Sequence, residues 1–189
     1  MYAEEQRRPD VAAARRRWRE IQSLQDMRAY VFLDECGVTT DLLRRYGRSP
    51  RGTRLHDHTP CGHWQTHTVI AGLRLGGLTA PAVFDGPIDN PSFLAYIDQI
   101  LVPSHWPGRN LLTAAIEAVG ATVRYLPPYS PDLNPIEQVF AKLKAFLRAA
   151  RPRSFDDVCA LMRDAIPRFA PAECGHYMQH AGYRVPTRL

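Results

Sequence analysis

The strongest constraint on the fold is a proline-rich stretch that leads straight into an amphipathic helix, over residues 127–147. Asn134 is a preferred N-cap residue, Pro135 suits the first helical position, and Glu137 occupies the third position of a capping box. An apolar stripe at helical spacing follows, made of Ile136, Val139, Phe140, Leu143 and Leu147. The pattern predicts a helix that starts after Asn134 and packs one face against a core.

Other segments have the periodicity and the breaks that are typical of strands. Residues 29–35 form a short apolar run that ends in acids and predicts a buried strand. Two more strands are expected over residues 66–75 and 78–84, joined by a Gly-Gly turn, and a fourth over residues 122–126. Helices are expected over residues 4–25, 92–101, 111–119 and 154–166, and from about residue 171. This order predicts an α/β fold whose early part is antiparallel.

The composition is that of a globular protein. The chain has 189 residues, of which 45% are hydrophobic and 23% charged, enough for one domain with a real core. A net charge of +5 raises the expectation of a polyanionic partner. The four cysteines are widely spaced with no CxxC pair, which favours reduced thiols in the cytoplasm. No segment is typical of a signal peptide or of a membrane span, so no membrane partner is expected.

Two acids stand out chemically. Asp34 ends an apolar strand, and Glu137 lies in the first turn of the predicted helix. Carboxylates from a strand end and a helix N-terminus can converge to hold divalent ions, and hard oxygen ligands suit magnesium. On the residues alone, a capping role is the favoured interpretation of Glu137, and Asp34 is equally explained as the end of a strand.

A resemblance to a known family changes that balance. Residues 31–37 (VFLDECG) and 126–144 (LPPYSPDLNPIEQVFAKLK) resemble the first and third acidic motifs of DDE-type insertion-sequence transposases of the mariner-like superfamily, and the likeness extends over about residues 4–183. The resemblance implies a ribonuclease H-like fold, a mixed sheet with flanking helices. It implies that Asp34 and Glu137 are the first and third catalytic acids and ligate magnesium or manganese. The implied activity is DNA transposition by metal-dependent cleavage and strand transfer.

The sequence departs from the family where the second catalytic aspartate belongs. Residues 107–113 contain neither an apolar strand nor an Asp-Asn pair, which we interpret as an internal deletion around residues 108–111 that removes one central strand. The remaining acids of the region are poor substitutes: Asp85, Asp89, Asp98 and Glu117. We therefore expect a catalytically defective copy, in which the strand at 122–126 closes the sheet beside the Asp34 strand. The alternative is a non-enzymatic remnant that binds DNA nonspecifically or pairs with intact transposase.

The expected domain organisation has three parts. Residues 1–28 are a helical linker, residues 29–150 the catalytic domain, and residues 151–189 a helical extension. The helix-turn-helix modules of full-length relatives are not found ahead of residue 1, so specific recognition of transposon ends is not expected, and a homo-oligomer is a further possible assembly.

Basic residues and histidines allow further hypotheses. Nucleic-acid contacts are assigned to Lys142, Lys144 and Arg148, although a solvated basic face is equally plausible. Arg15, Arg16 and Arg17 are expected to be solvated helix charges. A histidine- and cysteine-containing stretch invites a zinc hypothesis, but its spacing fits no standard zinc site: His56, His58, Cys61, His63 and His67.

Overall fold

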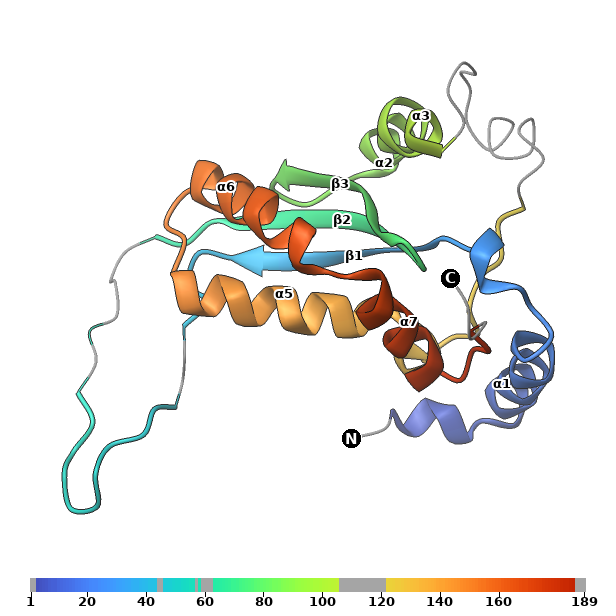
Figure 1. Cartoon of the computed structure of the whole chain (residues 1–189), viewed down its shortest axis with the longest axis horizontal. Coiled ribbons are helices and arrows are strands. Elements are labelled where there is room, and N and C mark those ends of the chain that lie inside the picture. Colours follow the sequence, from blue (N-terminus) through green and yellow to red (C-terminus); the bar gives the residue numbers. More distant parts are fainter. Residues whose placement is uncertain (1–2, 44–45, 57, 59–62, 106–121, 186–189) are drawn as a thin grey trace.

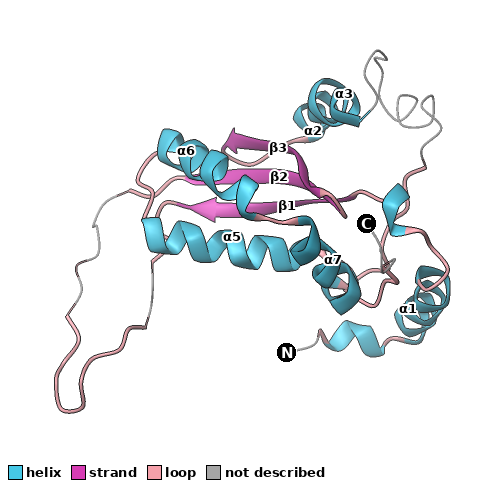
Figure 2. Ribbon diagram, in the orientation of Figure 1, coloured by secondary structure: helices cyan, strands magenta, loops and turns pink. Residues whose placement is uncertain are grey.

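The fold is built on a three-stranded antiparallel sheet (Figures 1 and 2). The computed structural model describes the chain except for residues 1–2, 44–45, 57, 59–62, 106–121 and 186–189. The strands are β1 (Phe32–Thr39), β2 (Thr66–Arg74) and β3 (Gly77–Asp85), in the order β1-β2-β3. The predicted strands at 66–75 and 78–84 are thereby confirmed. The expected helix at 111–119 and the deletion around 108–111 lie outside the described residues.

The two faces of the sheet carry separate clusters of buried side chains. Alternation along β2 directs Val69 and Leu73 to one face and Ile70 to the other. Helices α5 (Ile136–Ala150), α6 (Phe155–Ala165) and α7 (Pro171–His180) cover the first face. The second face packs on α2 (Asn90–Tyr96), the π-helical turn η3 (Ile97–Leu101) and α3 (Val102–His105).

The predicted apolar stripe anchors α5. Its five members are all buried in the first cluster, against β1 and β2: Ile136, Val139, Phe140, Leu143 and Leu147. The helix ends at Arg151, whose left-handed backbone (φ 56°) stops it. Helix α6 lies within the predicted helix over 154–166, and a capping box between Ser154 and Asp157 begins it.

The N-terminal segment folds against the loop that precedes α5. It consists of η1 (Glu4–Arg7), α1 (Pro9–Gln22) and η2 (Met27–Ala29). Helix α1 supplies side chains that reach the short turn η4 (Pro131–Leu133), and Figure 1 places it beside the end of α7. A further turn, η5 (Ile166–Arg168), joins α6 to α7. None of the helices in the described part of the chain is long and apolar enough to cross a bilayer.

Two expectations about the sheet are wrong. Residues 122–126 form no strand, and two of their large side chains are exposed, Val123 by 43% and Tyr125 by 87%. The segment therefore does not close the sheet beside β1, and within the described residues the sheet is antiparallel and not mixed. Strand β1 also continues past the acids to Thr39, because Cys36 and Val38 alternate into the core.

Candidate active site

Asp34 lies on the face of the sheet that α5 covers. Its side chain shares this face of β1 with Phe32 and Cys36. One carboxylate oxygen, Oδ1, accepts the backbone N–H of Glu35 (2.8 Å), and Oδ2 accepts the Asn134 side-chain amide (2.7 Å). Partial burial raises the pKa of Asp34, and the two hydrogen bonds oppose this rise. The carboxylate is thus held from two sides.

Asn134 has a different role from the one expected. Helix α5 begins at Ile136, and no side chain caps it. The Asn134 side-chain amide instead donates to Asp34, while the backbone carbonyl of Asn134 accepts the Glu137 backbone N–H at 3.3 Å. The capping-box interpretation of Asn134 and Glu137 is therefore wrong, because a tertiary hydrogen bond takes the side chain that would have capped the helix.

Glu137 lies in the first turn of α5, within the electrostatic influence of Asp34. Burial raises the pKa of Glu137, the negative charge of Asp34 raises it further, and the ammonium group of Lys144 lowers it. The same groups act on Cys36: burial is the main cause that raises the pKa of this thiol to about 11, with Lys144 opposing the rise and both carboxylates adding to it. The fold therefore gathers two acids, a thiol and a cation in one place, where a further positive charge would be stabilised.

The loop before α5 is fixed by an ion pair that the sequence did not suggest. The Arg15 side chain is only 8% exposed. Its Nη1 donates to Ser130 Oγ (2.7 Å) and to Asp132 Oδ1 (2.9 Å), and its Nη2 donates to Asp132 Oδ2 (2.7 Å). The expectation that Arg15 is solvated is wrong, whereas Arg16 and Arg17 are exposed as expected.

A second set of contacts joins the same loop to the C-terminal segment. The Tyr183 hydroxyl donates to the Leu133 carbonyl (2.9 Å) and accepts the Trp18 indole N–H (3.1 Å). Gln22 donates to the carbonyl of Ala181 (3.3 Å). Helix α1 and the segment after α7 thus clamp the turn that leads to Asn134, and this clamp fixes the position of its amide relative to Asp34.

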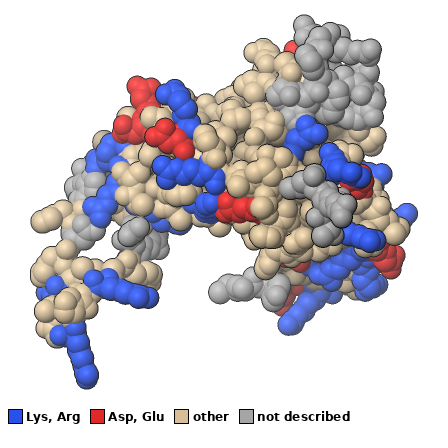
Figure 3. Space-filling view, in the orientation of Figure 1, with Lys and Arg blue, Asp and Glu red and all other residues tan. Residues whose placement is uncertain are grey.

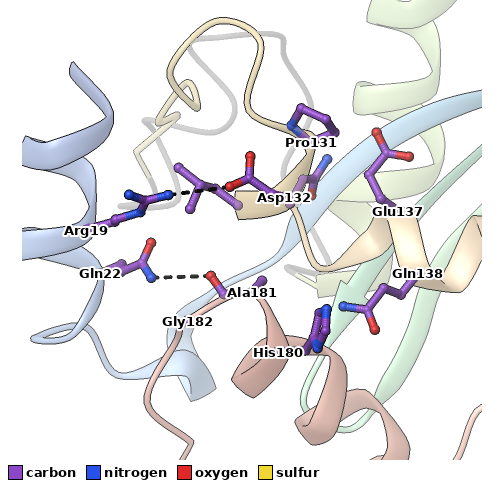
Figure 4. Close-up of a pocket in the computed structure, with 11 residues that line it drawn as sticks. Arg19, Gln22, Pro131, Asp132, Glu137, Gln138, His180, Ala181 and Gly182 are labelled. Carbon is purple, nitrogen blue, oxygen red and sulfur yellow. Dashed lines mark hydrogen bonds and ion pairs between the residues drawn. The ribbon is translucent and has the colours of Figure 1, made fainter. Parts of the chain in front are cut away.

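An open cleft lies beside Glu137 (Figure 4). It measures about 460 Å³ and is bounded by α1, the η4 turn, the start of α5 and the end of α7. Arg19, Gln138 and His180 line it together with Glu137. Arg19 lies 3.6 Å from the Asp132 carboxylate, so its guanidinium group already has a partner in the cleft.

The three basic residues assigned to nucleic-acid contacts fall into different surroundings. Lys142 donates to both carboxylate oxygens of Glu173 (2.7 Å each) and lies over the Phe169 ring, so it ties α5 to α7. Lys144 lowers the pKa of Glu137 and opposes the rise in the pKa of Cys36. Arg148 is half-buried on the same helix. Their role in DNA contact stays a prediction.

No third acid completes the pair within the described residues. No group of three His, Cys, Asp or Glu side chains in this part of the chain could hold a metal ion. Asp89 caps α2 through the Ser92 backbone N–H, and Asp98 belongs to η3, on the other face of the sheet. Asp85 ends β3, where it lies 3.0 Å from the buried His67. Glu117 and Cys61 lie outside the described residues.

Comparison with known structures shows the fold. The chain is similar to the Mos1 mariner transposase in a paired-end complex with manganese (TM-score 0.71, 13% identity, 96% of this chain and 60% of that one). It is similarly related to Mos1 transposase in a paired-end complex with the left transposon end (0.66, 14%, 96% and 61%), and in a strand transfer complex (0.67, 12%, 96% and 59%). The chain thus spans about three fifths of the length of these proteins. The likeness agrees with the expected ribonuclease H-like α/β class.

Comparison at the level of sequence identifies the family. No curated protein sequence gives a significant match. The family model described as DDE superfamily endonuclease matches residues 29–159, which is more than half of the chain and includes both Asp34 and Glu137. The chain therefore belongs to the DDE superfamily endonuclease family, as its two acidic motifs indicated, with the fold of a mariner-type transposase.

Proposed function

We propose that this chain is the catalytic domain of a DNA transposase, with Asp34 and Glu137 as the first and third acids of its active centre. The observation that carries the proposal is that Asp34 on β1 and Glu137 in the first turn of α5 lie close enough for the charge of Asp34 to raise the pKa of Glu137, and for both to act on Cys36. Residues 29–150 form the catalytic domain in this proposal. Helix α1 then belongs to the same unit through Arg15, and is more than a linker.

The donor set fits a divalent cation. Asp34 and Glu137 are hard oxygen ligands whose pKa values are raised by burial, and for Glu137 also by the negative charge of Asp34. A cation bound between the two carboxylates would stabilise their charged forms against both burial and mutual repulsion. Magnesium commonly binds through one or two carboxylates and keeps several waters, so two acids suffice for one weakly held ion. When bound, such an ion would polarise a phosphodiester and activate water. Manganese, present in a Mos1 complex, has the same ligand preference.

The protein groups have defined tasks in this proposal. Asn134 fixes the orientation of the Asp34 carboxylate through its 2.7 Å hydrogen bond. Lys144 favours the charged form of Glu137 and so keeps it ready to bind a cation. DNA would reach the pair through the cleft beside Glu137.

We further propose that this copy is catalytically defective. In-line displacement at phosphorus uses two ions about 4 Å apart, and three converging acids hold them in the family. Two acids are present on suitable elements, and the described residues supply no third. The second candidate function is a non-enzymatic one, DNA binding or pairing with intact transposase, and the net charge of +5 favours DNA as a partner.

Manganese titration followed by electron paramagnetic resonance tests the proposed site. We expect one weak site, with a Kd of about 1 mM, because the described part of the chain offers only two protein ligands. Asp34→Asn and Glu137→Gln should each abolish it. Glu35→Gln is the matched control, because Glu35 is the neighbouring, exposed acid on the same strand. Equal manganese binding by all four proteins would refute the assignment of the two acids.

A further inference from the structure

A basic arm projects from the end of the sheet, in the connection between β1 and β2. We define the arm as residues 46–56, all of which are exposed. Figure 1 shows it extending away from the sheet and the helices. The ladder of β1 and β2 ends where the Thr40 N–H donates to the Gln65 carbonyl (3.0 Å), and the arm lies beyond that point.

The tip of the arm has a defined conformation. The Thr53 backbone N–H and hydroxyl both donate to the Pro50 carbonyl (3.1 and 2.7 Å), and the Ser49 hydroxyl donates to the Thr53 carbonyl (2.7 Å). Gly52 takes a positive φ of 85°, which permits the tight turn. These hydrogen bonds hold the backbone of the tip in a turn.

The charges on the arm have one sign. Arg48, Arg51 and Arg54 are spaced three residues apart, and residues 46–56 contain no acid. None of the three forms an ion pair with a described residue. Figure 3 shows blue side chains on the arm, at the lower left, and no red ones on the face in view. Two arginines of α1 differ, since Arg15 and Arg19 lie close to Asp132.

A polyanion that lies at the two acids and runs along α5 would reach the arm. Asp34 precedes Thr40 by six residues of extended chain, which at about 3.3 Å per residue amounts to about 20 Å. Lys144 and Arg148 lie on α5 between the acids and its C-terminus. There, Arg151 donates to the His58 carbonyl (3.3 Å) and ties α5 to the return limb of the connection.

We propose that the arm binds the phosphate backbone of duplex DNA through Arg48, Arg51 and Arg54. This contact would lie away from the phosphodiester bond that the two acids would face. Guanidinium groups suit phosphate because they donate two parallel hydrogen bonds. Tyr46, exposed by 91%, offers an additional ring at the root of the arm. The inference rests on the proposed function, since it takes DNA as the partner, and it adds a binding surface outside the acid pair.

The salt dependence of DNA binding tests this assignment. A fluorescent duplex of about 30 base pairs is titrated with protein from about 50 to 200 mM NaCl, in EDTA so that no metal contributes. The triple variant Arg48→Ala, Arg51→Ala, Arg54→Ala should reduce the slope of log K against log [NaCl] by about 2 to 3, or about 0.9 for each phosphate contact. Its thermal unfolding should stay unchanged, because the three side chains are exposed and form no ion pair with any described residue.

The matched control removes the same charge elsewhere. Arg7→Ala, Arg16→Ala, Arg17→Ala alters three exposed arginines of the N-terminal segment and should change the slope by less than about 1. Equal slopes for the two triple variants would overturn the assignment. So would an arm variant that keeps its DNA affinity but changes its oligomeric state in light scattering, because the arm would then be a protein contact. If the unaltered protein shows no DNA affinity at low salt, the DNA partner of the proposed function fails as well.

Discussion

Replacing Arg15 by methionine should destabilise the protein by about 2 kcal/mol. Removing one partner of a fully buried ion pair costs about 3–5 kcal/mol, whereas an exposed pair contributes about 0–1 kcal/mol. Arg15 is 8% exposed but Asp132 is 35% exposed, so the cost should lie between these limits. Arg15→Lys keeps the charge but loses the two-pronged geometry, so about 1 kcal/mol is expected.

Urea unfolding followed by tryptophan fluorescence measures this loss. Trp18 lies on the same helix and donates to Tyr183, so its emission reports on the clamp. At a cost of about 2 kcal/mol the melting temperature should also fall, by about 4–8 °C for a chain of this size. Arg16→Met is the control, because Arg16 is the neighbouring, exposed arginine. A loss below about 0.5 kcal/mol, similar to that of the control, would show that the clamp does not hold the loop.

Three further predictions concern the acid pair and its neighbours. Asp34→Asn should raise stability at pH 7, because the pKa of Asp34 is raised in the folded state. The stability that Asp34 contributes is present below its unfolded-state pKa and is lost as the pH rises through its folded-state pKa, so the gain from the substitution should vanish in acid. Unfolding midpoints that shift equally at pH 3 and pH 7 would contradict this. Asn134→Asp should increase manganese affinity about tenfold or more, because it places a third carboxylate where the Asn134 amide now lies 2.7 Å from Asp34. Calorimetry showing an affinity no higher than that of the unaltered protein would rule out this position as a ligand. With a pKa of about 11, Cys36 should be about 0.1% thiolate at pH 8, so its reaction with Ellman's reagent should be slow. A fast reaction that disappears in Cys36→Ser would exclude the buried environment of this thiol.

The elements that could be predicted from sequence are those whose pattern is local. The stripe of α5 and the existence of α6 depend on residues three or four apart, and both formed as expected. Strands β2 and β3 were also found, because a short glycine turn joins two apolar runs. The family motif placed Asp34 and Glu137 on the correct elements.

The errors arose where a distant partner decides the outcome. Residues 122–126 have the composition of a strand, but a strand forms only beside a neighbour, and local sequence does not specify one. Asn134 has the residue type of an N-cap, yet Asp34 takes its amide from 100 positions away in the chain. Arg15 falls on the buried face of α1 with Val11 and Gln22, and this spacing could have revealed it.

Nicking of supercoiled plasmid DNA tests the central claim most directly. The protein is incubated with magnesium or manganese beside its Asp34→Ala variant, and open-circular product is quantified. Because the described residues supply only two acids for the centre, we predict that the two proteins give the same, background level of nicking. Metal-dependent nicking that disappears in Asp34→Ala would contradict the account, because the centre would then have its third ligand.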